Sequence, residues 1–464
     1  HARRRDGVRM PSHEDQPASA LERRLTRRGT VKLVTLGLSS VVIGPLLAAC
    51  GEAGETASGG DTSPTATTAL ASADPTPTSA PTTETAGTGE STPQAEGEPI
   101  RLGILLPFTG VYAQPAADVE RGVMVYLKGI GNEIAGRPVT VIREDSEADP
   151  STGITKARKL IERDQVDVMI GPLSSAVGTA VRDLVVSSGI PQIYPIPGTL
   201  EESGTPPAPN IFRVSYSPAQ LGVASARYLY ETLGYRTMAI MCPDYVWGQK
   251  VAEAFKSSFE ELGGTIADVT FTPLDTTDFA PYLGRVDPAS LDAMWVFYSG
   301  GDAIRFVVQY GEMGLTSDLP LTGAGDVVDE AFLPSQGDAA LGFVSFLPYT
   351  PSLENDANAA FVNAYQTEYD AAPGFFNEIG WVAAAIVDEA IRAVDGDVSD
   401  KAKLAAAMEQ VEFDSPHGRF RFDMNRFPIL DMQVRRVELD DSGEYVNTII
   451  DVIEGIDSNG MIGG

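Results

Sequence analysis

Cysteine and histidine are nearly absent from this chain, which has two Cys and three His in 464 residues. The cysteines are Cys50 and Cys242, and His417 is the only histidine beyond residue 50. Most metal sites built from several His ligands are therefore excluded, and a catalytic triad would depend on one distant histidine. The chain also lacks the G-x-S-x-G, H-E-x-x-H and phosphate-loop motifs. We therefore expect the protein to have no enzymatic activity and to bind neither a metal ion nor a cofactor.

Basic residues are scarce as well, with 34 Lys plus Arg against 64 Asp plus Glu. Nine of the basic residues but only four of the acidic ones lie in residues 1–50, so the rest of the chain carries a net charge near −35. A surface this acidic repels phosphate backbones, which argues against nucleic acid as a partner. With Cys242 as its single thiol, this part of the chain has no intramolecular disulfide and depends on packing for stability.

The first fifty residues contain a basic stretch followed by an uncharged apolar run over residues 33–49. The run is shorter than the roughly 20 residues of a membrane-spanning helix and contains two Gly and one Pro. A basic start, an apolar middle and small residues at the end are typical of an export signal, here residues 1–49. The ending "LLAAC" resembles the lipobox of bacterial lipoproteins, which implies cleavage before Cys50 and lipid attachment to its thiol. A cysteine buried in a short hydrophobic helix is the alternative.

The export route stays open, because "TRRGTVKL" partly matches the twin-arginine motif while ordinary secretion fits equally well. Residues before Met10 fit either the signal or an upstream extension. Residues 50–98 consist mainly of Gly, Ser, Thr, Ala, Pro and Glu. This segment has too little apolar surface to offset the entropy of ordering, so we expect a disordered tether between a lipid anchor and a folded body.

From residue 99 onward, strand-like apolar runs alternate with helical patterns. A first series has the runs "IRLGILLPF", "PVTVIRED", "VDVMIGPL" and "IPQIYPIP". A second series follows a break near Tyr216, with "RTMAIMCPD", "TIADVTFTP", "DAMWVFYSG" and "LPLTGAGD". Two long helical patterns cover residues 355–369 and 375–394, and antiparallel strands end the chain. Such alternation predicts an α/β fold of two lobes with parallel sheets, and a ligand site in the cleft at the carboxyl ends of the strands.

The folded body resembles the type I periplasmic substrate-binding proteins of ABC importers, in the leucine/isoleucine/valine-binding branch. The resemblance covers nearly all of 99–455 and rests on "IRLGILLPFTGVYA", "EDSEADPSTGITKARKLIERDQVDVMIGPLSSA", "AIMCPDYVWGQ", "TTDFAPYLGRV" and "FDSPHGRFRFD". It implies two Rossmann-like lobes joined by a three-segment hinge, with crossings near 215–218, 347–349 and 412–416. Lobe one would comprise 99–216 plus 348–412, and lobe two 217–347 plus 413–464. Ligand binding would close the hinge, and the closed form would dock on a permease.

The resemblance also assigns the groups that hold a ligand carboxylate and polar head. Ser174 and Ser175 match the hydroxyl and N–H groups after the third strand, and N–H groups at a helix N-terminus form an anion site. Plain capping of the helix by either serine is the alternative. Ile196, Gly198 and Thr199 match the next segment, which grips the polar head.

Aromatic residues supply the expected walls. Trp247 matches an aromatic side chain that closes over the ligand, and Tyr298 and Ser299 match another wall. Core packing is an equal alternative for Tyr298. Phe108 and Tyr112, in the first loop, are further candidates.

Two positions depart from the family pattern. Amino-acid binders pair the ligand ammonium with an acid at the position of Gly325, and the acid here is Asp326. Asp326 either serves that purpose or caps a helix in "VVDEAF". A disulfide of some relatives matches Ala148 and Ser174, so that bond is absent.

The sequence therefore predicts an exported, lipid-anchored solute receptor of an ABC importer on the outer face of the cell membrane. Its partners would be a permease, the membrane through the lipid anchor, and a small carboxylate, foremost a branched-chain or other apolar amino acid. We expect a monomer. Aromatic acids, amides or urea are alternative ligands, and sensing for a membrane receptor is an alternative role. Cys242 is predicted to be a buried core residue.

Overall fold

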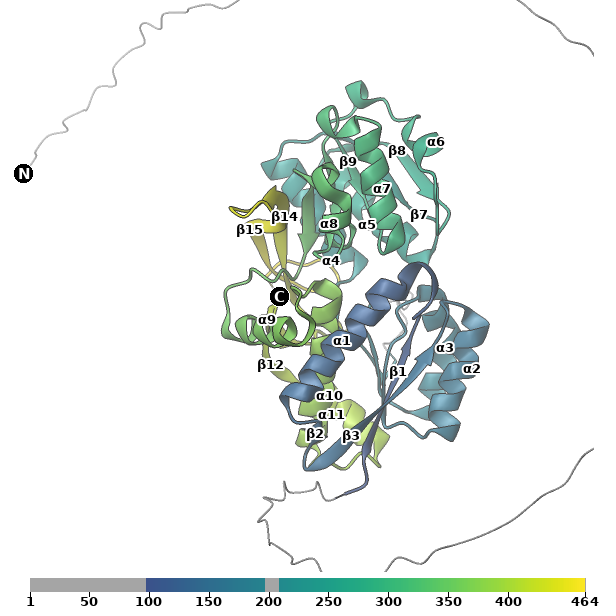
Figure 1. Cartoon of the computed structure of the whole chain (residues 1–464). Coiled ribbons are helices and arrows are strands. Elements are labelled where there is room, and N and C mark those ends of the chain that lie inside the picture. Colours follow the sequence, from purple (N-terminus) through teal and green to yellow (C-terminus); the bar gives the residue numbers. More distant parts are fainter. Residues whose placement is uncertain (1–96, 197–207, 464) are drawn as a thin grey trace, which may run out of the picture. The chain divides into compact units, whose positions relative to one another are not determined.

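Two large sheets organise the computed structural model, which describes residues 97–196 and 208–463 (Figure 1). The first sheet has the strand order β2-β3-β1-β4-β5-β6. Its strands are β1 (Ile100–Leu106), β2 (Glu133–Ile134), β3 (Arg137–Asp145), β4 (Val168–Ile170), β5 (Gln192–Tyr194) and β6 (Ile211–Arg213). Strands β3, β1, β4, β5 and β6 run parallel, so their carboxyl ends meet at one edge of the sheet.

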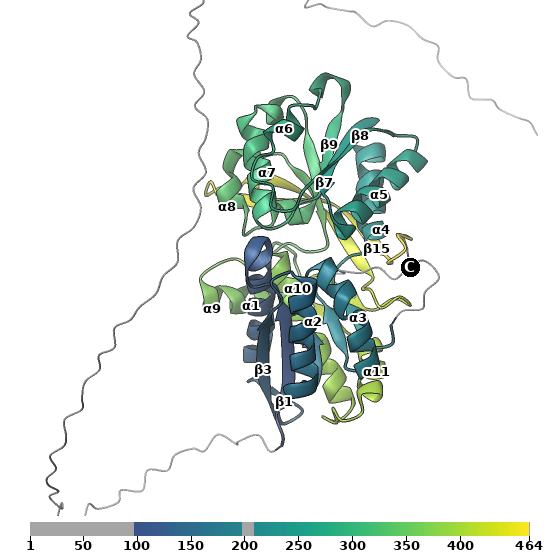
Figure 2. The same ribbon diagram turned by 90° about the vertical axis from the view of Figure 1, so that its right-hand side faces the viewer.

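Helices cover both faces of this sheet, which explains the uninterrupted apolar runs of its strands. Successive side chains of β1 point to opposite faces. Ile104 belongs to the core that contains α1 (Ala113–Gly129) and α10 (Phe375–Ala393), whereas Leu105 packs with α2 (Pro150–Arg158) and α3 (Ser175–Ser188). Helices α9 (Asp356–Tyr369) and α11 (Lys401–Glu409) pack against α1 and α10 in the same lobe (Figure 2).

The second sheet has the order β15-β14-β11-β10-β9-β7-β8. Its strands are β7 (Thr237–Pro243), β8 (Thr265–Thr272), β9 (Ala293–Val296), β10 (Leu321–Ala324), β11 (Val344–Leu347), β14 (Leu430–Leu439) and β15 (Tyr445–Ile456). The pairs β11–β14 and β14–β15 are antiparallel and the others are parallel. The accompanying helices are α4 (Pro218–Arg227), α5 (Val246–Glu261), α6 (Ala280–Leu283), α7 (Gly301–Glu312) and α8 (Leu333–Gln336).

The predicted α/β class with two parallel sheets is confirmed, as are the two long helices and the antiparallel end of the chain. The sequence did not predict β6, which lies in the segment read as a break and pairs with β5. The chain passes between the sheets after β6 and after β11. It returns to the second sheet after α11, by way of the hairpin of β12 (Glu412–Ser415) and β13 (Gly418–Arg421).

Several expectations lie outside the described residues. These are the export signal 1–49, Cys50, the tether up to residue 96, Gly198 and Thr199. Within 97–196 and 208–463, no helix has both the length and the apolar character needed to cross a membrane.

Candidate functional site

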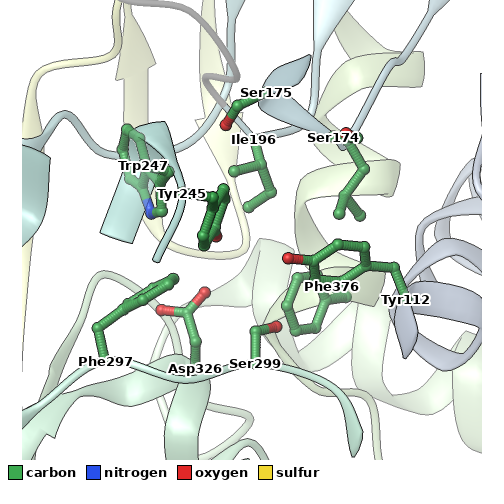
Figure 3. A pocket seen from close by; sticks show the side chains of 11 residues that line it. Tyr112, Ser174, Ser175, Ile196, Tyr245, Trp247, Phe297, Ser299, Asp326 and Phe376 are labelled. Atoms are coloured by element: carbon green, nitrogen blue, oxygen red, sulfur yellow. The ribbon is translucent and has the colours of Figure 1, made fainter. Parts of the chain in front are cut away.

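A pocket lies where the strand ends of the two sheets meet (Figure 3). Its free space is about 340 Å³, part of which is open to solvent. Its lining comes mainly from segments that follow β1, β4, β5, β7, β9 and β10, which is where parallel α/β sheets bind ligands. The lining residues are Tyr112, Leu173, Ser174, Ser175, Ile196, Tyr245, Trp247, Phe297, Ser299, Asp326 and Phe376.

One end of the pocket is the N-terminus of α3. Ser174 is the N-cap residue, with extended backbone (φ −74°, ψ 128°), and α3 begins at Ser175. The side chain of Ser174 makes no capping hydrogen bond, so helix capping does not account for its hydroxyl group. The first N–H groups of a helix have no partner within the helix and carry partial positive charge. This end of the pocket is therefore suited to an anion.

The other lobe contributes the carboxyl group of Asp326, in the 3₁₀ turn Gly325–Val328 after β10. The side chain points into the pocket beside Phe297 and Ser299 (Figure 3). Its Oδ2 accepts a hydrogen bond from the Tyr216 hydroxyl. Burial raises the pKa of Asp326 to about 6, against the opposing effects of the Tyr216 hydrogen bond and the Arg435 charge. The alternative of helix capping fails, because "VVDEAF" forms a 3₁₀ turn and a loop in place of the helix expected there.

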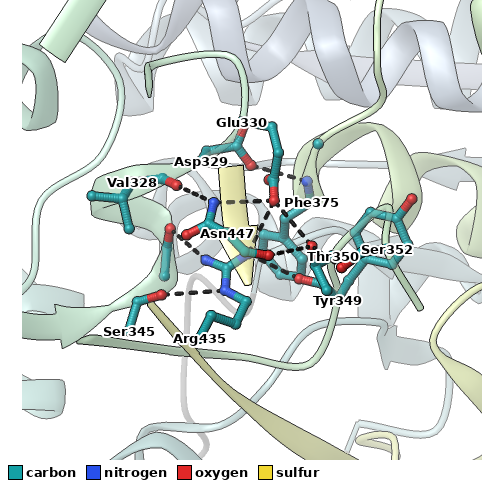
Figure 4. Close-up of polar contacts among 12 residues, drawn as sticks. Val328, Asp329, Glu330, Ser345, Tyr349, Thr350, Ser352, Phe375, Arg435 and Asn447 are labelled. Carbon is teal, nitrogen blue, oxygen red and sulfur yellow. Dashed lines mark hydrogen bonds and ion pairs between the residues drawn. The ribbon is translucent and has the colours of Figure 1, made fainter. Parts of the chain in front are cut away.

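Arg435 of β14, fully buried, holds the turn that carries Asp326 (Figure 4). Its guanidinium donates to the carbonyl oxygens of Gly325 at 3.2 Å and Tyr349 at 3.0 Å, and to Ser345 Oγ at 3.2 Å. A Cβ atom at position 325 would lie 2.3 Å from Arg435 Nη2. A Cβ at this position would also lie 2.5 Å from Leu347 Cβ, so a side chain there would collide with both neighbours.

Aromatic rings form most of the wall between these two ends: Tyr112, Tyr245, Trp247, Phe297 and Phe376. Tyr112 precedes α1 in the first lobe and Tyr245 precedes α5 in the second, and the two phenol groups interact electrostatically. Burial raises the pKa of both phenols, so both are neutral at physiological pH. Among the described lining residues, the polar groups of this wall are these two hydroxyls, the indole N–H of Trp247 and Ser299.

The structure thus brings Tyr112, Ser174, Ser175, Ile196, Trp247, Ser299 and Asp326 together among the residues singled out from the sequence. Tyr298 lies in the core instead, with its ring stacked 4.6 Å from Phe306. Phe108 packs under the guanidinium of Arg143 at 3.6 Å and is not part of the lining.

The sequence reading missed Leu173, Tyr245, Phe297 and Phe376. Leu173 and Tyr245 stand within two positions of residues that had been selected, so the strand-end rule could have found them. Phe297 takes the place expected of Tyr298 because β9 ends at Val296. Phe376 belongs to α10, which is far along the sequence from the other lining residues. No motif near it in the sequence predicted that it would line the pocket.

Other reactive groups do not form a second centre in the described part of the chain. Cys242 is buried in the core, as expected, and burial raises the pKa of its thiol. Within residues 97–196 and 208–463, no three His, Cys, Asp or Glu side chains are grouped to hold a metal ion.

Comparisons with known proteins agree with this arrangement. The family profile described as periplasmic binding protein matches residues 99–444. The Leu/Ile/Val-binding protein homolog 6 of Brucella melitensis biotype 1 is 26% identical over 366 residues, covering 78% of this chain and 93% of the relative.

Two solved structures extend the comparison. An ABC transporter substrate-binding protein from Sphaerobacter thermophilus has 38% identity and a TM-score of 0.73, covering 78% of this chain and 100% of that one. An ABC transporter solute-binding protein from Rhodopseudomonas palustris BisB5, in complex with 3,4-dihydroxybenzoic acid, has 30% identity and a TM-score of 0.72, covering 78% and 99%.

Proposed function

This chain belongs to the periplasmic binding protein family, as a substrate-binding protein of the ABC-transporter type, and we propose that its ligand is an amino acid with an apolar side chain. Branched-chain and aromatic amino acids are the foremost candidates. The observation that carries the proposal is the position of Asp326 in a pocket whose other lobe contributes the N-terminus of α3.

These two features suit the two charges of an amino acid. The ligand carboxylate would bind the Ser174 and Ser175 region, where helix N–H groups favour an anion. The ligand ammonium would pair with Asp326, since a buried ammonium without a partner costs several kcal/mol. The side chain would lie against the aromatic wall, for example Trp247 and Phe376.

Both lobes contribute to the lining, so a bound ligand would favour the closed arrangement of the lobes. Tyr112 from one lobe and Tyr245 from the other both line the pocket. Delivery of the ligand to a permease, export of the chain, and attachment to the membrane through Cys50 complete the proposed role.

An aromatic carboxylate is the second candidate. It is favoured by the ring-lined pocket and by the relative solved with 3,4-dihydroxybenzoic acid. With its pKa raised to about 6, Asp326 would need only a modest further rise to be protonated near neutral pH and to donate to a carboxylate.

A thermal-shift screen separates the candidates, with amino acids, benzoates, short amides and urea as the panel. A ligand at about a hundred times its Kd adds roughly 2.7 kcal/mol of stability, which raises Tm by a few degrees. Shifts confined to apolar amino acids are expected. Shifts with benzoates and none with amino acids would replace the proposal by the second candidate.

A further inference from the structure

Tyr216 contacts the lining residue Asp326 but is not itself part of the pocket lining. It lies between β6 and α4, where the chain first passes from one sheet to the other, and is 1% exposed. Its ring lies 5.9 Å from that of Trp247 and 6.0 Å from that of Phe375, measured between centroids. Packing on both sides fixes the direction of its hydroxyl, which donates to Oδ2 of Asp326.

Three side chains in the described part of the chain interact with the Asp326 carboxyl. Tyr216 faces it from the crossing segment, Tyr245 from the start of α5, and Arg435 from β14, and each interacts with it electrostatically. Asp329 and Glu330 follow on the same loop. Tyr216 is the neighbour whose side chain donates a hydrogen bond to the carboxyl group directly.

We propose that Tyr216 is a positioning residue that determines specificity: its hydroxyl keeps the Asp326 carboxylate anionic and directs the free oxygen at a ligand ammonium. The inference rests on the proposed function, because it assumes that Asp326 pairs with an ammonium. It assigns to a residue outside the lining the choice between ligands that carry an ammonium and ligands that do not.

The physical argument concerns protonation. Burial favours the neutral acid and raises the pKa of Asp326 to about 6, and the hydrogen bond from Tyr216 favours the anion. Without that hydrogen bond the pKa rises further, and a larger fraction of Asp326 is protonated at neutral pH. A protonated carboxyl pairs poorly with an ammonium. Amino-acid binding should therefore weaken as pH falls through the Asp326 pKa, and Tyr216→Phe should move this loss to higher pH.

The test is calorimetric titration of the wild-type chain and its Tyr216→Phe variant from about pH 5 to about pH 8. The probes are L-leucine and L-phenylalanine, with 4-methylpentanoate and 3-phenylpropanoate as matched acids without the ammonium. For Tyr216→Phe we expect the midpoint of amino-acid binding to rise by about one pH unit, with an affinity loss of about fivefold at the old midpoint. The matched acids should lack this loss at low pH.

Tyr298→Phe is the matched control, because Tyr298 is also buried and its hydroxyl lies 3.2 Å from Thr272 Oγ1, away from the pocket. It should leave the binding midpoint unchanged. Asp326→Asn, which keeps an acceptor for Tyr216, should remove the pH dependence and serves if Tyr216→Phe does not fold. An unchanged midpoint in Tyr216→Phe, or a pH dependence that survives in Asp326→Asn, overturns the inference while leaving amino-acid binding intact. Failure of every amino acid to bind the wild-type chain overturns the proposed function as well.

Discussion

Asp329 Oδ2 accepts a hydrogen bond from the backbone N–H of Phe375 at 2.9 Å, so the loop after β10 in the second lobe caps α10 of the first lobe. Oδ1 of the same carboxyl accepts from the Ala331 N–H at 3.1 Å. Burial is the main cause that raises the pKa of Asp329, with Glu330 adding to it. The contact joins the lobes a few residues from both Asp326 and Phe376, which line the pocket.

This contact can be tested through Gly374, where an added Cβ would lie 2.4 Å from Asp329 Oδ1. Alanine suits the extended backbone of residue 374 (φ −102°), so Gly374→Ala should disturb only the approach of Asp329. We expect a loss of roughly 1 kcal/mol or more in the free energy of unfolding, which largely disappears in an Asp329→Ala background. Denaturant titration of the single and double variants measures this coupling, and strictly additive effects would contradict the contact.

Gly300 provides a test of the contact between the lobes next to the lining residues Ser299 and Tyr112. Its Cβ would lie 2.5 Å from the carbonyl oxygen of Val111, which belongs to the first loop of the other lobe. Gly300→Ala should hinder approach of the lobes and weaken binding of the tightest amino acid by about tenfold or more, as measured by calorimetry.

Gly337 is the matched control for that variant. Its backbone (φ 56°, ψ −144°) is nearly that of Gly300 (φ 59°, ψ −139°), but its Cβ would meet only Tyr445 Oη, at 3.7 Å. Both alanine variants should lose a similar 1–3 kcal/mol or so to backbone strain, and only Gly300→Ala should lose affinity. Equal affinity in the two variants would show that the Val111 contact is not used in the bound form.

Ser174 and Asp149 occupy the same position on neighbouring helices and should behave differently. Asp149 caps α2 by accepting from the Thr152 N–H at 2.8 Å, whereas Ser174 makes no such bond on α3. Asp149→Ala should lower the free energy of unfolding by about 1 kcal/mol and leave ligand affinity unchanged. Ser174→Ala should leave stability nearly unchanged and weaken carboxylate binding severalfold. The reverse pattern in denaturation and binding data would assign Ser174 to capping.

Asp326→Asn should separate stability from binding. The pKa of Asp326 is higher in the folded protein, about 6, than its ordinary value of 3.8, so the folded state holds the extra proton between these values. Stability therefore falls as pH rises through this window, and above it the buried carboxylate destabilises the fold by up to roughly 3 kcal/mol. At pH above about 7 the ligand-free variant should unfold at higher denaturant than the wild type, and below about pH 4 the two should coincide. A less stable variant at neutral pH would contradict the burial argument.

Much of the fold followed from pattern alone, because strands buried on both faces read as apolar runs separated by amphipathic helices. The same regularity brought Ser174, Ser175, Trp247 and Asp326 to one place, since each follows the end of a parallel strand. Resemblance to the family then suggested their roles, which remain predictions.

Contacts between distant segments were beyond the sequence. The space at Gly325 is limited by Arg435, which is 110 positions away in the sequence. Phe376 lines the pocket because α10 packs in the first lobe, although the chain enters the second lobe before it reaches this helix. Phe297 lines the pocket in place of the expected Tyr298 because β9 ends at Val296. A shift of one residue along a strand moves a side chain to the opposite face of the sheet.

The most direct test of the central claim is a pair of titrations of the wild-type chain at about pH 7.5, with L-leucine and 4-methylpentanoate. The two ligands share the carboxylate and the apolar chain and differ in the ammonium that Asp326 would bind. The account predicts that L-leucine binds about a hundredfold or more tightly than the acid, and that L-phenylalanine exceeds 3-phenylpropanoate in the same way. Equal affinities, or tighter binding of the acids, would contradict it.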